Sequence, residues 1–215
     1  MIDLHTHTLF SDGELLPAEL VRRALVIGYQ AIGLTDHADS SNLDLIVPRL
    51  VEVCRDLNRY WPIKVIPGVE LTHLPPELIV PLTSRARALG AQIVVVHGET
   101  IAEPVPPGTN QQAILAGVDI LAHPGLISAA EAAWAREKGV LLEITSRSGH
   151  SLTNGHVAQV AKEVGANLIL NTDTHAPGDL ISAEKALQVV LGAGLQEDHF
   201  QIMLENARRI IAHVG

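Results

Sequence analysis

Histidines and carboxylates that could bind metal ions recur along this 215-residue chain. His5 and His7 stand two residues apart, and Asp173 and His175 repeat that spacing much later in the chain. Residues two apart on an extended strand point to the same side, so each pair could hold one ion. Imidazole and carboxylate without thiolate suit Zn, Mn or Fe and do not select among them. Further residues of these types follow short aliphatic runs: Asp36, His37, Glu70, His97 and His123.

Seven aliphatic runs bounded by turn residues predict the strands that must position these side chains. They alternate with segments of helical spacing, and this alternation is typical of parallel strands joined by right-handed crossovers. Glycines follow several of the helical segments, as helix ends require. The predicted strands span 2–5, 31–35, 64–69, 92–97, 118–123, 140–145 and 167–172, and the predicted helices span 17–27, 44–60, 77–89, 110–116, 129–138, 155–164, 182–191 and 197–212.

Seven such units favour a closed α/β barrel, in one domain over residues 1–215. A doubly wound open sheet is the alternative, because neither strand order nor closure is visible in a sequence. Barrel enzymes build their sites on the loops that leave the carboxyl ends of the strands. The candidate ligands fall at those ends, so we expect them to meet on one rim.

Composition narrows the class of protein. Hydrophobic residues make up 47% and charged residues 18%, which is ordinary for a folded domain. The net charge of -9 and the 3% aromatic content argue against a surface that holds nucleic acid. Cys54 is the only cysteine, so no intramolecular disulfide is expected. We see neither a signal peptide nor an apolar stretch long enough to span a membrane, and a cytoplasmic location is expected.

Together these motifs resemble the PHP family, which is named after polymerase and histidinol phosphatase. The resemblance runs in order from residue 3 to residue 175 and implies a distorted seven-stranded (β/α)7 TIM-like barrel with surrounding helices and three divalent metal ions. The motifs are His5-Thr6-His7 with Ser11-Asp12-Gly13, Thr35-Asp36-His37, Pro67-Gly68-Val69-Glu70, Val96-His97-Gly98, Ala122-His123-Pro124-Gly125 and Asp173-Thr174-His175.

The resemblance also implies three ligand sets. Glu70 belongs to two of them and is the expected bridge between two ions. The first set is His5, His7, Glu70 and Asp173; the second is Glu70, His97 and His123; the third is Asp12, His37 and His175.

Such a site suits the hydrolysis of a small-molecule phosphate monoester, as in histidinol phosphatases. Three divalent ions and three carboxylates leave a charge of about +3, which attracts anions. Two ions about 3.5–4 Å apart share a water and lower its pKa, so that a bridging hydroxide is the expected nucleophile. Arg147 is the candidate phosphate anchor, and His150 is a candidate acid for the leaving group. Glu99 is a candidate for substrate or ligand contact, and Asp36 and Glu143 are candidates for support behind the ligands.

Two other functions remain open from the residues. One is a nucleotide phosphatase or an exonuclease on short nucleic acids. The negative net charge and the scarcity of aromatic residues argue against it. The other is a non-catalytic module stabilised by metal, for which a full ligand set would be unnecessary. The Pro-rich segment 103–108 is expected to be a surface loop, and His73, His156, His199 and His213 are expected to be structural or exposed.

Overall fold

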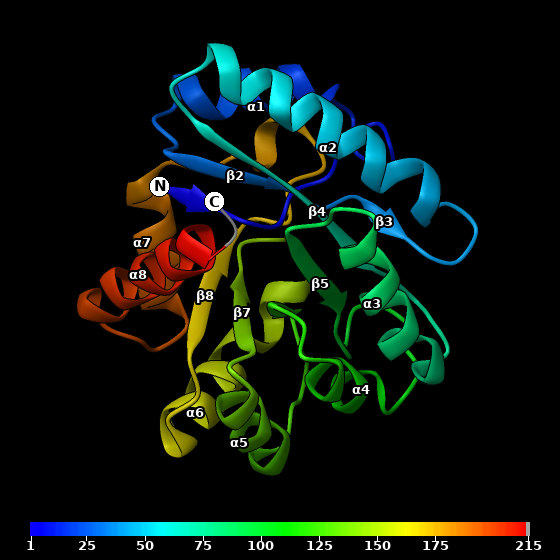
Figure 1. The fold of residues 1–215 in the computed structure, drawn as a ribbon. Helices are drawn as coiled ribbons and strands as arrows, with labels where there is room; N and C mark the ends of the chain where they lie inside the picture. The colour runs from blue at the N-terminus through cyan, green and yellow to red at the C-terminus, as the bar shows by residue number, and fades with distance from the viewer. Residues whose placement is uncertain (214–215) are drawn as a thin grey trace.

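A computed structural model describes residues 1–213 as a nearly closed barrel of seven parallel strands with helices around it (Figure 1). The seven predicted strands are confirmed, with ends that shift by a few residues. They are β1 (Ile2–Asp3), β2 (Ala31–Leu34), β4 (Lys64–Leu71), β5 (Ile93–His97), β6 (Ile120–Ala122), β7 (Leu141–Thr145) and β8 (Leu168–Asn171).

The strands lie in the order β1-β2-β4-β5-β6-β7-β8, and every pairing between neighbours is parallel. The residues that directly follow β1 and β8 then pair with each other. The amide of Asp173 donates to the carbonyl of His5 at 3.0 Å, and the amide of His7 donates to the carbonyl of Thr174 at 2.8 Å. These bonds close the sheet, so the barrel is confirmed and the open-sheet alternative is wrong.

Eight α-helices and three short 3-10 helices are described in residues 1–213, and each predicted helix is confirmed. The turn residues act as expected, since Ser128 and Glu131 form a capping box and Gly139 ends the same helix at a φ of 73°. The helices are α1 (Pro17–Val26), α2 (Leu43–Tyr60), α3 (Ile79–Ala88), α4 (Thr109–Ala116), α5 (Ala129–Lys138), α6 (Asn154–Val164), α7 (Ala183–Gly192) and α8 (Glu197–His213), with η1 (Pro76–Leu78), η2 (His150–Thr153) and η3 (Pro177–Asp179).

Alternate strand residues pack together in one buried cluster, as expected of side chains that point into a barrel. Ile93 and Val95 of β5 belong to it, as do Ile120 and Ala122 of β6. Ala207 of α8 joins the same cluster. The outward-facing strand residues pack against the surrounding helices in two further clusters. The strands are therefore buried on both faces of the sheet.

One short strand, β3 (His37–Ala38), was not predicted. It pairs with β4, where His37 is the register partner of Glu70. The chain leaving β2 is held by Asp36, whose carboxylate accepts hydrogen bonds from the amides of Thr8 and Ser11. This support places His37 beside β4 rather than at the tip of β2.

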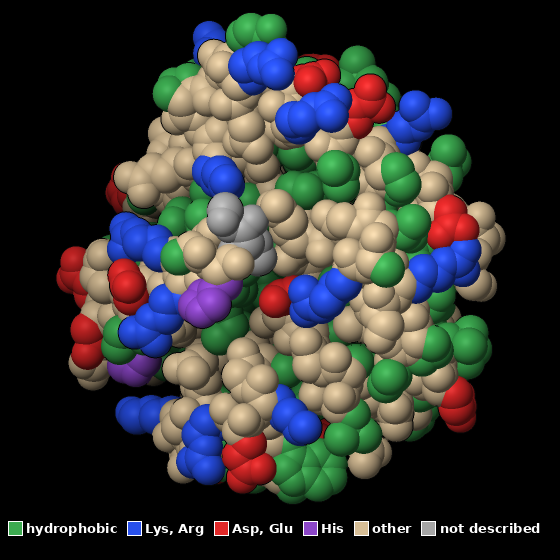
Figure 2. Space-filling view, viewed as in Figure 1, with side chains coloured by type: hydrophobic (Ala, Val, Ile, Leu, Met, Phe, Trp, Pro, Cys, Tyr) green, Lys and Arg blue, Asp and Glu red, His purple; other side chains and the backbone are tan. Residues whose placement is uncertain are grey.

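The face of the molecule seen in Figure 2 carries dispersed charges of both signs and little histidine. None of the helices within residues 1–213 has the length and apolar character that a membrane crossing requires.

Candidate metal centre

The carboxyl ends of the strands bring the predicted ligands together around one cleft of about 460 Å³. Five of the nine predicted ligands line its wall, while the other four lie buried. Serine, threonine and asparagine side chains from the segments after β1, β3 and β4 also reach the wall. The lining residues are Ser11, Asp12, His37, Ala38, Asp39, Ser41, Asn42, Thr72, His73, His97, Glu103, Arg147, His150, Asp173 and His175.

Glu70 occupies the middle of the cluster. Its Oε1 lies 3.3 Å from His5 Nε2 and 3.8 Å from His123 Nε2. Its Oε2 lies 2.7 Å from His37 Nδ1 and 3.6 Å from His7 Nε2. The Glu70 side chain is fully buried. One carboxylate thus faces four imidazoles.

Asp173 completes the first set. Its Oδ1 lies 3.1 Å from His7 Nε2 and 3.6 Å from His5 Nε2. The donor atoms of His5, His7 and Glu70 all lie within 4.8 Å of one another, so these three could hold one ion. His5, His123 and Asp173 form another such group.

Glu143 fixes the orientation of His5 from behind. Its Oε2 lies 2.8 Å from His5 Nδ1 and accepts a second hydrogen bond from Asn171 Nδ2. With Nδ1 donating to Glu143, a neutral His5 ring presents the lone pair of Nε2 toward Glu70 and Asp173. This is the supporting position expected for Glu143.

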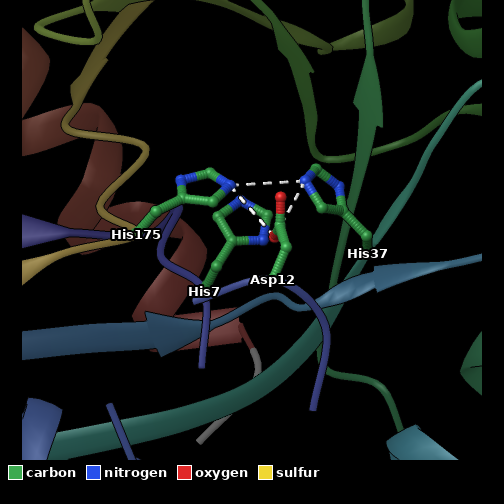
Figure 3. A group of neighbouring side chains, drawn as sticks. All are labelled: His7, Asp12, His37 and His175. Carbon is green, nitrogen blue, oxygen red and sulfur yellow. Dashed lines mark hydrogen bonds and ion pairs between the residues drawn. The ribbon is translucent and has the colours of Figure 1, made fainter. Parts of the chain in front are cut away.

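The third predicted set also lies together (Figure 3). Asp12 Oδ1 is 3.2 Å from His175 Nε2 and 3.5 Å from His37 Nε2. The two Nε2 atoms of His37 and His175 are 3.4 Å apart, and the His7 ring packs 4.1 Å from both of their rings. His7, Asp12, His37 and His175 therefore form one group that could hold an ion.

The second set differs in part from the expectation. His97 and His123 are adjacent, with ring centroids 4.5 Å apart, but their close third neighbour is His150. The His150 ring stacks on His123 at 4.1 Å, and its Nδ1 lies 2.8 Å from Thr100 Oγ1. The structure thus adds His150 to the donors around this position.

Burial and mutual contacts shift the pKa values of the clustered histidines and carboxylates in different directions. Burial lowers the pKa of His7 and of His123 well below the ordinary value, and neighbouring histidines add to the effect. Burial raises the pKa of Asp173 to about 7. Burial opposes the charged form of Glu70, but His5 and His37 hold its pKa well below the ordinary value. Crowded imidazoles that stay neutral keep their lone pairs free.

Unpartnered buried atoms test whether metal ions fit here. Within residues 1–213, eight buried side-chain nitrogen or oxygen atoms have no hydrogen-bond partner, and six of them belong to predicted ligands. Polar atoms left unpaired in an interior cost free energy, and cations remove that cost by using the lone pairs. The donor set therefore fits divalent ions. The six atoms are His5 Nε2, His7 Nδ1, His7 Nε2, Glu70 Oε1, His123 Nδ1 and Asp173 Oδ1.

Two predicted ligands have an unusual backbone. His123 and Asp173 adopt positive φ values of 27° and 55°, and His73 does so at 52°. Residues other than glycine rarely adopt this region, and they often do so at functional sites. All three lie on the rim of the cleft or directly behind it.

The remaining candidates lie in different surroundings. Arg147 lines the cleft and donates to Asp179 Oδ2 at 3.0 Å. Glu99 does not line it, because its Oε1 accepts hydrogen bonds from the amides of Gly108 and Asn110 at the start of α4. The substrate contact predicted for Glu99 therefore gains no support. Asp36 supports the loop after β1, as the sequence suggested.

Two cleft residues were missed by sequence reasoning. His73 and Glu103 both line the cleft, where His73 Nε2 lies 2.9 Å from Glu103 Oε2. His73 follows β4 by only two residues, and that proximity to a strand end was the available signal. Glu103 sits in a Pro-rich loop whose path the sequence does not reveal.

Comparison with known proteins assigns the family. Residues 3–94, which contain His5, His7, Asp12, His37 and Glu70, match the PHP domain. A protein of Methanocaldococcus jannaschii, itself uncharacterized, is 54% identical over 90% of this chain and 89% of its own length. The chain belongs to the PHP domain family.

More distant relatives of this PHP chain carry functional names. A protein of Thermoanaerobacter sp. (strain X514), named a probable phosphatase, is 27% identical over 92% of this chain and 88% of its own length. Among solved structures, a chain of archaeal ribonuclease P bound to mature tRNA gives a TM-score of 0.75 at 17% identity, covering 100% of this chain and 91% of that chain. A candidate histidinol phosphatase of Listeria monocytogenes gives 0.63 at 12% identity, covering 86% and 99%. At these identities the two structures support the fold alone.

Proposed function

We propose that this PHP chain is a metal-dependent phosphatase that hydrolyses a small-molecule phosphate monoester at a site of three divalent ions. The observation that carries the proposal is the convergence of six unpartnered buried donor atoms beside one open cleft. The proposed ligands are His5, His7, Glu70 and Asp173 for one ion, Glu70, His97 and His123 for a second, and Asp12, His37 and His175 for a third.

The chain's own residues set up the reaction. When bound, divalent ions supply an activated water at neutral pH and neutralise phosphate charge. Glu70 holds the centre of the ligand cluster, and Glu143 keeps His5 in the tautomer that exposes its Nε2. Three carboxylates against three divalent ions give a net charge of about +3 at the base of the cleft, which favours an anionic substrate.

His150 is the proposed contact for the leaving group. Its Nδ1 lies 2.8 Å from Thr100 Oγ1, and its Nε2 lies 3.5 Å from Glu103 Oε1 in the lining of the cleft. Burial and His97 lower the pKa of His150. That shift favours the neutral ring, so the proposed contact with the leaving group rests on the place of His150 in the lining of the cleft.

Arg147 is the proposed anchor of the phosphate. Asp179 orients the guanidinium, and the same Asp179 oxygen accepts hydrogen bonds from the amides of His175 and Ala176. Arginine has five donors, so the ion pair leaves others for a phosphate.

Arg147→Ala is expected to raise KM about tenfold or more with a smaller change in kcat, since a charge-assisted hydrogen bond to bound substrate contributes about 1.5–3 kcal/mol. Steady-state kinetics would measure both constants. Arg49→Ala, on the exposed side of α2, is the control and should leave them unchanged. Unchanged constants in Arg147→Ala would remove Arg147 from the substrate site.

Nucleotide phosphatase or exonuclease activity is the second candidate. Phe10, which precedes Ser11 of the cleft lining, is 38% exposed and could stack on a base. The lining of the cleft contains no aromatic residue besides histidine, which favours a small substrate without a base.

A substrate panel distinguishes the candidates. Histidinol phosphate, other small phosphate monoesters, mononucleotides and short oligonucleotides would be compared at equal concentration with metal-loaded protein. We expect the highest kcat/KM among the small monoesters. Turnover confined to oligonucleotides would overturn that ranking, and no turnover of any phosphoester would favour a non-catalytic module.

A further inference from the structure

The loop between β5 and α4 delivers one carboxylate to the rim of the metal centre. Glu103 Oε2 lies 2.9 Å from His73 Nε2 and 3.2 Å from His97 Nε2. Its other oxygen, Oε1, lies 3.5 Å from His150 Nε2. Three imidazoles thus surround one carboxylate that lies outside the nine positions of the family motif.

The loop is held so that Glu103 points into the cleft. Glu99, near the start of the loop, accepts hydrogen bonds from the amides of Gly108 and Asn110 at its end. Thr100, next to Glu99, contacts His150 and also accepts a hydrogen bond from the amide of Ala102. The position of Glu103 therefore follows from contacts elsewhere in the loop.

The tautomer of His97 makes its contact with Glu103 informative. His97 Nδ1 lies 3.2 Å from the carbonyl of Gly98, which can only accept a hydrogen bond. Nδ1 therefore carries a proton, and in the neutral ring Nε2 presents a lone pair to the carboxylate. Nε2 is therefore the His97 atom that could bind an ion shared with Glu103.

Further imidazoles lie close enough to His97 to share such an ion. The rings of His73, His123 and His150 lie 4.9, 4.5 and 5.5 Å from the His97 ring. Of these rings, His73 is the one whose donor atom groups with those of His97 and Glu103.

The distances agree with shared coordination. Two ligands bound at about 2.1 Å with angles of about 90–109° at the ion lie about 3.0–3.4 Å apart. The oxygen of Glu103 is 2.9 and 3.2 Å from the nitrogens of His73 and His97. The donor atoms of these three residues also lie within 4.8 Å of one another.

We propose that Glu103, assisted by His73, is a ligand of the ion that His97 holds, in addition to the nine ligands of the family motif. The proposal rests on the metal centre of the proposed function. It gives the loop between β5 and α4 a direct part in holding an ion.

Metal binding in the absence of substrate tests this proposal. Metal-free full-length protein would be titrated with Zn²⁺ in competition with a chromophoric chelator, for the wild type, Glu103→Gln and His73→Gln. We expect Glu103→Gln to weaken the binding of one ion about tenfold or more and His73→Gln to weaken the same ion, with the other ions unaffected. Zn²⁺ affinities equal to those of the wild type in both variants would overturn the proposal.

Glu77→Gln is the matched control, because it removes one carboxylate from exposed η1, outside the lining of the cleft. Its Zn²⁺ affinities should equal those of the wild type. If Glu103→Gln does not fold, as judged by circular dichroism, His73→Gln alone decides the outcome. Because no phosphoester is present, the titration would stand even if the chain hydrolysed none.

Discussion

Glu70→Gln is expected to lower kcat for phosphate monoesters by more than about 100-fold, because even residues that only support metal ligands contribute about 10–100-fold. The substitution keeps the shape of the side chain. It replaces a charge that faces four imidazoles with a neutral amide, one end of which donates hydrogen bonds. The binding of two ions should weaken together, since Glu70 is the proposed bridge.

Glu143→Gln is the informative comparison for this variant. Glu143 is as buried as Glu70, but its contacts are His5 and Asn171. It should lower kcat by about 10–100-fold, less than Glu70→Gln. Kinetics and metal content would be measured on both variants after circular dichroism confirms that they fold. Near-normal kcat in Glu70→Gln would contradict the bridging role.

Gly125→Ala is expected to lower the free energy of unfolding by at least about 2 kcal/mol. Gly125 has a φ of 62°, and a Cβ there would lie 1.8 Å from the carbonyl oxygen of Glu99. Both the backbone and the loop after β5 would have to move. Because Gly125 follows His123 by two residues, metal affinity should fall as well.

Chemical denaturation and thermal melting would measure this change, and about 2 kcal/mol corresponds to a melting temperature lower by about 4–8 °C in a chain of this size. Gly155→Ala is the matched control, because it lies in α6 with open space around the added carbon. It should leave stability unchanged or raise it by up to about 1 kcal/mol. Equal stability of Gly125→Ala and the wild type would show that the turn after His123 is not tightly constrained.

Strand ends were the part of the site that the sequence could predict. Buried parallel strands are continuous aliphatic runs, so the end of each run is visible, and the carboxyl ends of parallel strands meet on one face. This rule predicts His5, Glu70, His97 and His123 on a common rim. It also places Glu143, inside the β7 run, behind them.

Loop paths were not predictable in the same way. Glu103 reaches His97 only because Glu99 closes the loop between β5 and α4, and neither contact follows from local propensity. His73 turns toward the cleft through a positive φ, which sequence patterns rarely predict for a histidine. The short strand β3 depends on the hydrogen bonds of Asp36 to a distant loop.

The grouping of ligands around each ion is also hard to read from sequence. The family motif gave three sets, whereas the structure interleaves them, with His7 contacting Glu70, His37 and His175. Side chains from different strands pack by shape and charge in three dimensions. The motif therefore predicts which residues belong to the metal centre better than it predicts which of them contact one another.

Metal content and phosphatase activity, measured together on the purified protein before and after chelation, test the central claim most directly. We expect about three divalent ions per chain and hydrolysis of a small phosphate monoester. That activity should be lost when the ions are removed and should recover when Zn²⁺, Mn²⁺ or Fe²⁺ is restored. Hydrolysis that persists in fully metal-free protein would contradict it.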